Sequence, residues 1–199
     1  AAEPAGPAYR IDGRPAAAGA FYAAACDPQR SVVVEACAGA GKTWMLVSRV
    51  LRALLAGAEP QQILAITFTR KAAGEMRARL DEWLAGHAQT ACDHHQRVRA
   101  LQARGLDAAQ AEALAPAFGA LHERLLQGGR AVEVMTFHGW FTQLLAHAPL
   151  ALMQRLGLPA QYEPLEDITV LRDALLRRFH RAVQADAALR GDYLALVGR

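Results

Sequence analysis

Residues 32–43, VVVEACAGAGKT, constrain the fold of this chain more than any other stretch. Three β-branched residues, Val32, Val33 and Val34, predict a short buried strand. A turn of small residues follows, then Gly-Lys-Thr, then an apolar helical pattern. Strand, glycine-rich turn, Gly-Lys-Thr and helix in this order are typical of a phosphate-binding loop.

The residue types of this loop suit phosphate binding. Gly39 and Gly41 let the backbone curl with its N–H groups inward, in conformations that a Cβ would obstruct. The helix that begins there adds the positive end of its dipole at the same place. Lys42 can then reach the outer phosphates of a nucleoside triphosphate, and the Thr43 hydroxyl can ligand a magnesium ion.

These roles define a first candidate site. Lys42 and Thr43 are its candidate catalytic residues, and Thr43 is also the candidate magnesium ligand, through the bound triphosphate. The candidate nucleotide-binding residues are Ala38, Gly39, Ala40, Gly41, Lys42, Thr43 and Trp44. The loop departs from the general pattern G-x-x-x-x-G-K-[ST] because Ala36 stands where the first glycine is usual.

Two further apolar runs alternate with helical patterns. Residues 63–68 (ILAITF) and 132–136 (VEVMT) predict strands, the first of them parallel and buried on both faces. A helix follows the first run, and its apolar residues recur at every fourth position: Ala72, Met76, Leu80 and Leu84. Strands that alternate with helices predict an α/β fold with a parallel sheet.

The flanking regions are expected to be helical or irregular. Residues 1–20, with three prolines among small residues, predict a flexible lead-in. Residues 86–130 predict a helical insertion with breaks near Gly105 and Pro116. Residues 163–167 predict an acidic loop before a long last helix. The apolar face expected for that helix carries Leu171, Leu175, Phe179 and Val183.

Composition narrows the class of protein. The net charge of +3 and the pI near 9.0 permit a polyanionic partner without requiring one. Three cysteines without regular spacing favour a reducing cytoplasm over a disulfide framework. No apolar run approaches the roughly 20 residues that span a bilayer, so we expect no membrane segment. The N-terminus lacks the basic-then-apolar order of a secretory signal.

Two stretches beyond the loop resemble motifs of one helicase family. Residues 63–80 (ILAITFTRKAAGEMRARL) closely resemble motif Ia of the UvrD/Rep group of superfamily 1 helicases. Residues 134–145 (VMTFHGWFTQLL) resemble the Thr-Phe-His-Ser-Phe motif that follows it in the same group. Alanine in place of the first loop glycine is also usual there. Three motifs in the family's order, each just after an expected strand, cover roughly residues 31–150.

Within this group the layout resembles the helicase subunits of AddA/RecB-type helicase–nucleases, which process broken double-stranded DNA ends. In UvrD and Rep the second and third motifs lie close together, whereas residues 81–133 separate them here. The resemblance implies a RecA-like ATP-binding domain 1A over residues 21–150, with an incomplete parallel sheet and the helical insertion at 86–130. Residues 151–199 resemble the start of the family's helical 1B subdomain, here truncated.

The resemblance also implies cofactors, partners and site residues. ATP and Mg²⁺ would bind at the Gly-Lys-Thr loop, and the motor would move on single-stranded DNA in repair or recombination. A nuclease domain or partner subunit is the further partner implied. The candidate DNA-binding residues are Thr67, Phe68, Thr69, Arg70, Thr136, Phe137 and His138. At the spacing where the family often reads adenine with a glutamine, this chain has Phe21, an aromatic that could stack on the base.

Other interpretations remain open. Phe68 could pack in the strand core, and Thr67 and Thr69 could be β-formers or helix caps. His138 could cap or pack at a helix start. The whole chain could be a stand-alone nucleotide- or nucleic-acid-binding module without motor activity, or a small P-loop kinase. No Asp-Glu pair follows a strand to act as Walker B, so we expect this chain alone to be inactive as an ATPase or motor.

Overall fold

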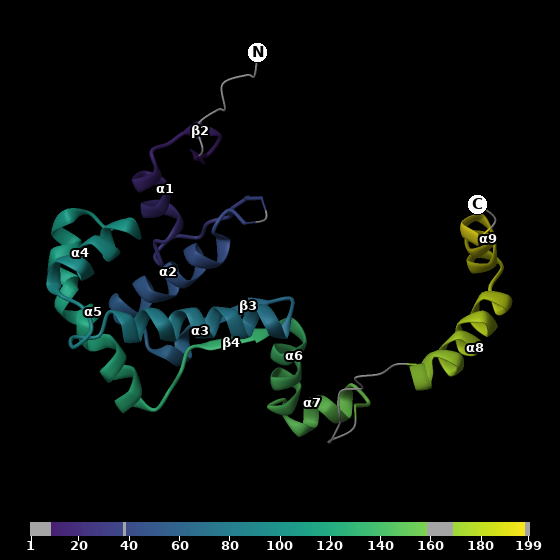
Figure 1. The fold of residues 1–199 in the computed structure, drawn as a ribbon. Helices are drawn as coiled ribbons and strands as arrows, with labels where there is room; N and C mark the ends of the chain where they lie inside the picture. The colour runs from purple at the N-terminus through teal and green to yellow at the C-terminus, as the bar shows by residue number, and fades with distance from the viewer. Residues whose placement is uncertain (1–8, 38, 159–168, 198–199) are drawn as a thin grey trace, which may run out of the picture. The chain divides into compact units, whose positions relative to one another are not determined.

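The computed structural model describes residues 9–37, 39–158 and 169–197. A first compact unit extends to Phe141, and a second begins at Thr142. The first contains β1 (Arg10–Ile11), β2 (Arg14–Pro15), α1 (Ala18–Ala25), α2 (Lys42–Leu55), the short 3₁₀ helix η1 (Pro60–Gln62), β3 (Leu64–Thr67), α3 (Arg70–Gly86), α4 (His94–Ala103), α5 (Ala108–Gly128) and β4 (Glu133–Thr136) (Figure 1). Helix α6 (Phe137–Ala146) spans the boundary, and α7 (Leu150–Arg155), α8 (Thr169–Ala185) and α9 (Ala187–Val197) lie in the second unit.

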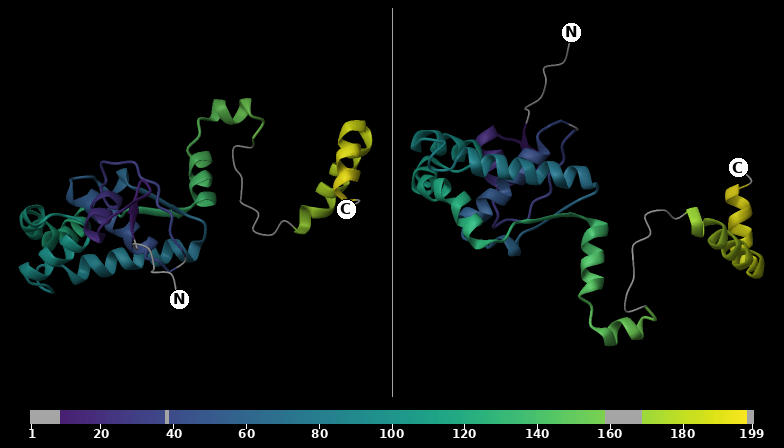
Figure 2. Two further views of the ribbon diagram at one scale, coloured as in Figure 1. Left: turned by 90° about the horizontal axis from the view of Figure 1, so that it is seen from above. Right: turned by 60° about the horizontal axis from the view of Figure 1, so that its bottom comes forward.

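Strands β3 and β4 form a parallel pair in which Leu64 lies opposite Glu133 and Thr67 opposite Thr136. Helix α3 packs along this pair, as the views in Figures 1 and 2 show. The parallel pairing confirms the mixed α/β class. The expectation that residues 63–68 are buried on both faces is wrong, because Leu64 is exposed and the rest of β3 is half-buried. With β4 as its one partner among the described residues, β3 keeps an accessible edge.

Residues 31–37 are not part of a strand in the described structure. Val33 is 95% exposed, and Val32 is exposed as well. The prediction of a buried strand at Val32, Val33 and Val34 is therefore wrong. A β-branched run forms a strand only where a neighbouring strand hydrogen-bonds its backbone, and β3 and β4 pair with each other instead.

The core of the first unit lies between α2, α3, α5 and β4. The buried face of α2 carries Val47, Leu51 and Leu54, spaced for one side of a helix. Helix α3 contributes the expected stripe of Met76, Leu80 and Leu84, with Ala73 buried in place of the predicted Ala72. The other buried core residues are Val50, Leu101, Ala111, Ala115, Phe118, Leu121, Val132 and Val134. Each fully buried leucine contributes about 1.5–3 kcal/mol to folding.

Residues 86–130, expected to be helical, contain α4 and α5, which pack against each other. Asp93 and Asp107 start these helices with capping boxes. The break expected near Gly105 is present, but the break expected at Pro116 is not, because α5 continues through the proline. A proline inside a helix costs about 3 kcal/mol, and burial of Phe118 and other core residues on both sides of Pro116 opposes that cost.

The region expected to be a lead-in carries an unanticipated hairpin, β1–β2, followed by α1. Two arginines of α2 hold the end of α1: Arg49 donates to the carbonyl oxygens of Ala25, Asp27 and Arg30, and Arg52 donates to that of Ala23. The backbone of Gly105 lies directly against α1, where a Cβ would come within 2.2 Å of the Ala23 backbone nitrogen. The N-terminal segment is thus fixed to α2 and to the α4–α5 turn.

In the second unit, α8 packs on α9, with the Phe179 and Tyr193 rings 5.8 Å apart. The apolar face predicted for α8 is buried only at Val183, whereas Leu171, Leu175 and Phe179 are exposed. The Asp186 side chain accepts the backbone N–H groups of Ala188 and Leu189 and so starts α9, which the sequence pattern did not separate from α8. The acidic loop expected at 163–167 lies outside the described residues.

The close approach at Gly105 generates a stability prediction. We expect Gly105→Ala to lower the free energy of unfolding by more than about 2 kcal/mol, because the residue has a φ of +83° and the new Cβ would overlap the α1 backbone. Urea unfolding followed by circular dichroism measures the change.

Gly57→Ala is the matched control, because Gly57 has a φ of +96° but open space around its missing Cβ. It carries only the conformational cost, about 1 kcal/mol. Equal destabilisation by the two substitutions would contradict the close packing of the α4–α5 turn on α1.

Candidate functional site

The glycine-rich loop curls at the N-terminus of α2. Gly39 and Gly41 have φ values of +77° and +85°, in the left-handed region that favours glycine. The Ala40 N–H donates to the Cys37 carbonyl oxygen at 3.3 Å and closes a turn. Gly41 is the N-cap of α2 and provides no side chain, so the first N–H groups of the helix stay available for a ligand. Ala38 lies outside the described residues.

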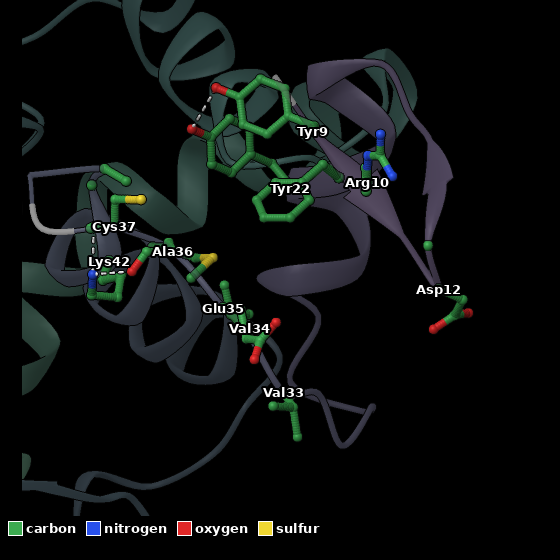
Figure 3. A pocket seen from close by; sticks show the side chains of 15 residues that line it. Tyr9, Arg10, Asp12, Tyr22, Val33, Val34, Glu35, Ala36, Cys37 and Lys42 are labelled. Atoms are coloured by element: carbon green, nitrogen blue, oxygen red, sulfur yellow. Dashed lines mark hydrogen bonds between the residues drawn. The ribbon is translucent and has the colours of Figure 1, made fainter. Parts of the chain in front are cut away.

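The side chain of Lys42 folds back under this loop. Its Nζ donates to the carbonyl oxygens of Ala36 and Cys37, each at 2.6 Å (Figure 3). The ammonium group is therefore held at the mouth of the loop while the residue remains exposed. Thr43 follows in the first turn of α2 and is half-buried. The Lys42 ammonium and the N-terminal N–H groups of α2 lie together at the loop, and this set of donors fits a polyphosphate.

A cavity of about 720 Å³ adjoins the loop. Ala36, Gly41 and Lys42 line its loop side, while Tyr9 and Tyr22 line the other side (Figure 3). Its volume lies within the range of about 300–1,000 Å³ that is usual for small-molecule sites. The cavity therefore offers one ligand a side with the Lys42 ammonium and loop backbone, and an aromatic side.

The aromatic side is built from the N-terminal segment. The Tyr9 ring lies 4.9 Å from that of Phe21 and 5.6 Å from that of Tyr22. The Tyr9 and Tyr22 hydroxyls share a hydrogen bond of 3.3 Å, which with burial raises the pKa of Tyr22 to about 12. Tyr22 thus stays neutral at physiological pH, and the aromatic side of the cavity adds no negative charge from this phenol.

Trp44, one of the candidate nucleotide-binding residues, is half-buried and is not among the residues that line the cavity. The ring lies 5.1 Å from that of Tyr22 and 5.8 Å from that of Trp83. The sequence pattern did not single out Tyr9 and Tyr22, because residues 1–20 predict a lead-in and only Phe21 has the spacing of a base contact. The clustering of aromatic residues within an alanine-rich segment is the signal that could have found them.

The second candidate site lies at the carboxyl ends of β3 and β4. Thr67 and Thr136 are opposite each other in the parallel register. The Thr67 hydroxyl donates to the Thr69 carbonyl oxygen at 2.9 Å. The Thr69 hydroxyl accepts the Ala72 N–H at 3.1 Å, and the Thr136 hydroxyl accepts the Gly139 N–H at 3.1 Å. Thr69 and Thr136 therefore start α3 and α6, as the capping interpretation expected of Thr69.

Two aromatic rings project at the same edge of the sheet. Phe68 is 89% exposed, so the alternative that it packs in the strand core is wrong. Phe137 is 41% exposed, and the two ring centroids lie 5.7 Å apart. Arg70 and His138 are both exposed and complete the predicted set at the first turns of α3 and α6. The structure thus brings all seven residues predicted from two distant motifs to one edge of the sheet.

Within the described ranges, none of the helices combines the length and the hydrophobicity needed to cross a membrane.

Comparison with known proteins identifies similar sequences. The model of the UvrD/REP helicase N-terminal domain matches residues 20–186. The chain is 46% identical over 54 residues to a Lactobacillus helveticus protein whose name describes a subunit of an ATP-dependent helicase/nuclease; the match covers 27% of this chain and 4% of that protein. Proteins of the same name from Streptococcus sanguinis and Lactococcus lactis subsp. lactis are 44% and 36% identical over 55 and 70 residues, or 28% and 35% of this chain. The matched segments span only 4% and 6% of those two relatives.

The geometry of the loop generates a labelling prediction. Cys37 is exposed in the loop, Cys92 is half-buried, and Cys26 is buried, which raises the pKa of its thiol. Because the thiolate is the nucleophile, we expect iodoacetamide to modify Cys37 first and Cys26 only after denaturation. Peptide mass spectrometry over a time course measures the order. Equal rates at Cys26 and Cys37 in the folded protein would contradict the packing of α1 on α2.

Proposed function

The chain belongs to the UvrD/REP helicase N-terminal domain family, and we propose that it is the ATP-binding part of an ATP-dependent DNA helicase or translocase that acts on single-stranded DNA. The names of the similar proteins support a role in DNA processing, and we assign the parent protein to DNA repair or recombination in the cytoplasm. The match covers a small part of those relatives, so the activity of the whole protein is part of this proposal.

The observation that carries the proposal is the loop itself. Gly41 at the N-terminus of α2 and Lys42 line a cavity large enough for a nucleotide, and Gly39 and Gly41 give the loop its left-handed turn. In the nucleotide complex the loop N–H groups bind the inner phosphates, and Lys42 exchanges its two carbonyl partners for the outer phosphates. The Thr43 hydroxyl would be a ligand of Mg²⁺, and the metal ion would supply positive charge against the phosphates for phosphoryl transfer.

The chain alone is proposed to bind ATP without appreciable turnover. Phosphoryl transfer depends on acidic side chains that position the metal and the attacking water. The Asp81–Glu82 pair lies inside α3 rather than after a strand, so it is a poor candidate for that task. We therefore assign those groups, and the second RecA-like lobe that closes on the nucleotide, to the longer protein.

The same proposal accounts for the open sheet. We interpret residues 31–37 as a strand of domain 1A that pairs only when further strands of the longer protein lie beside it. The exposed Val33 and the open edge of β3 support this interpretation, since both would be covered by such strands. Residues 21–150 then form the ATP-binding domain 1A with its helical insertion at 86–130. Residues 151–199 begin the helical 1B subdomain.

Single-stranded DNA is proposed to lie across the carboxyl ends of β3 and β4. Phe68 and Phe137 offer ring faces on which bases of any sequence can stack. Thr67, Thr69 and Thr136 supply hydroxyls, and Arg70 and His138 supply basic groups, to the phosphates beside the rings. This composition suits a motor that must move along arbitrary sequence. The names of the similar proteins include the words nuclease and subunit, and we propose a nuclease domain or partner subunit as the further partner.

The nucleotide site is tested with the only two lysines of the chain. We expect Lys42→Ala to weaken binding of a fluorescent ATP analogue with Mg²⁺ at least about tenfold, because a charge-assisted contact to phosphate is lost. Fluorescence titration gives the dissociation constants.

Lys71→Ala is the control, since Lys71 is exposed on α3 and pairs with Glu75 at 3.9 Å. It is expected to change affinity less than about twofold. Equal weakening of nucleotide binding by Lys42→Ala and Lys71→Ala would refute the proposed nucleotide site. Steady ATP turnover by the wild-type chain, lost in Lys42→Ala, would refute the proposed inactivity and favour a self-sufficient enzyme.

The DNA site is tested at its most exposed ring. We expect Phe68→Ala to weaken binding of a fluorescent single-stranded oligonucleotide about tenfold, the loss of one stacked base. Fluorescence anisotropy measures the affinity, and Phe179→Ala, which removes an exposed ring from α8, is the control. Nucleotide binding without any DNA binding would favour the P-loop kinase or a nucleotide-binding module.

A further inference from the structure

Arg104, in the turn between α4 and α5, is nearly buried, with 5% of its surface exposed. Its guanidinium lies 4.1 Å from the centre of the Trp83 ring and 5.5 Å from that of Trp44. Its Nη1 donates to the Ala100 carbonyl oxygen at 2.6 Å. Burial lowers the pKa of Arg104 to about 10, so the group stays charged at neutral pH and can interact with both rings as a cation.

The contacts continue from Trp44 to the cavity. Trp44 follows the Gly-Lys-Thr sequence and packs edge-on against Tyr22, with the ring centroids 5.1 Å apart. The hydroxyls of Tyr22 and Tyr9 share a hydrogen bond, and both tyrosines line the aromatic side of the 720 Å³ cavity. Arg104 is not among the residues lining that cavity. A continuous series of packed rings thus joins a buried cation in the helical insertion to the wall of the nucleotide site.

A second connection reinforces the first. The backbone of Gly105 contacts the α1 backbone at Tyr22 and Ala23. Arg52 of α2 donates to the carbonyl oxygens of both Ala23 and Arg104, at 3.2 and 3.3 Å. The α4–α5 turn, α1 and α2 are therefore held as one assembly, and this assembly supports the aromatic wall.

We propose that Arg104 is a positioning residue that holds Trp44, and through it Tyr22 and Tyr9, as the wall on which the base of a bound nucleotide stacks. The helical insertion thereby sets the affinity for the base without touching the ligand. The inference rests on the proposed nucleotide site and adds a role for residues 86–130. Stacking rather than hydrogen bonding to the base edge also makes the site tolerant of different bases.

The test compares two ligands that share phosphates but not a base, ATP and inorganic tripolyphosphate, each with Mg²⁺ and the full 199-residue chain. Isothermal titration gives both dissociation constants. We expect the wild type to bind ATP about tenfold more tightly than tripolyphosphate, as expected for one stacked base. Arg104→Met should reduce this ratio to about twofold or less and leave the tripolyphosphate constant within about twofold.

Arg97→Met is the matched control. Arg97 is a half-buried arginine within α4. Like Arg104, it donates from Nη1 to one carbonyl oxygen, that of Cys92 at 2.6 Å, but it contacts neither Trp44 nor Trp83 in the described cation–aromatic pairs. It should leave the ATP-to-tripolyphosphate ratio unchanged. Arg104→Lys keeps the charge without the planar group and should give an intermediate ratio.

Trp44→Leu provides a second route if Arg104→Met does not fold. It breaks the series one step closer to the cavity while keeping Arg104 against Trp83. Trp44→Leu should also reduce the preference for ATP over tripolyphosphate. A folded Arg104→Met or Trp44→Leu with the wild-type ratio would overturn the inference, as would equal weakening of both ligands. A wild type that binds both ligands equally overturns this inference alone, whereas one that binds neither overturns the proposed nucleotide site.

Discussion

Helix α2 is the element on which the rest of the structure depends, because it both packs in the core and carries the glycine-rich loop at its N-terminus. Val47, Leu51 and Leu54 on one face anchor it in the core against α3 and α5. This packing fixes the direction of the helix axis and so the place where its N-terminus presents the loop. The Lys42 ammonium, bonded to two carbonyl oxygens of that loop, is then held at one position beside the cavity. A core that let α2 tilt would displace the loop and the Lys42 ammonium together.

The sheet shows how strand formation depends on neighbours. Residues 32–34 are three valines and have the stronger β-branched pattern, yet β3 (Leu-Ala-Ile-Thr) is the strand, because β4 offers its backbone a parallel partner. The hydrophobic effect alone does not order a β-branched run, since its N–H and C=O groups must also be paired. Exposed Val33 and exposed Phe68 therefore have different origins. The first lies in a segment without a paired strand, whereas the second lies at a strand end, where exposure leaves an aromatic face available to a ligand.

The N-terminal segment lines the cavity beside the loop, and residues distant in the sequence hold this segment in place. Arg49 and Arg52 of α2 bind the carbonyl groups at the end of α1, so α1 is attached to the same helix that carries the loop. Gly105 allows the α4–α5 turn to approach α1 closely. The arginines of α2 and Gly105 thus hold the aromatic side of the cavity in place. No continuous hydrophobic pattern in the sequence indicates this arrangement.

The sequence alone determined the features that depend on local chemistry. The loop needs glycines at positive φ beside a lysine, α3 needs an apolar residue every fourth position, and Thr69 can start a helix wherever an N–H lacks a partner. Only the tertiary structure decided the features that depend on distant neighbours. These include the unpaired state of residues 31–37, the continuation of α5 through Pro116, and the packing of Arg104 between Trp44 and Trp83. The reason is physical: backbone pairing, burial and cation–aromatic contact are properties of two groups in space, and no single stretch of sequence contains both.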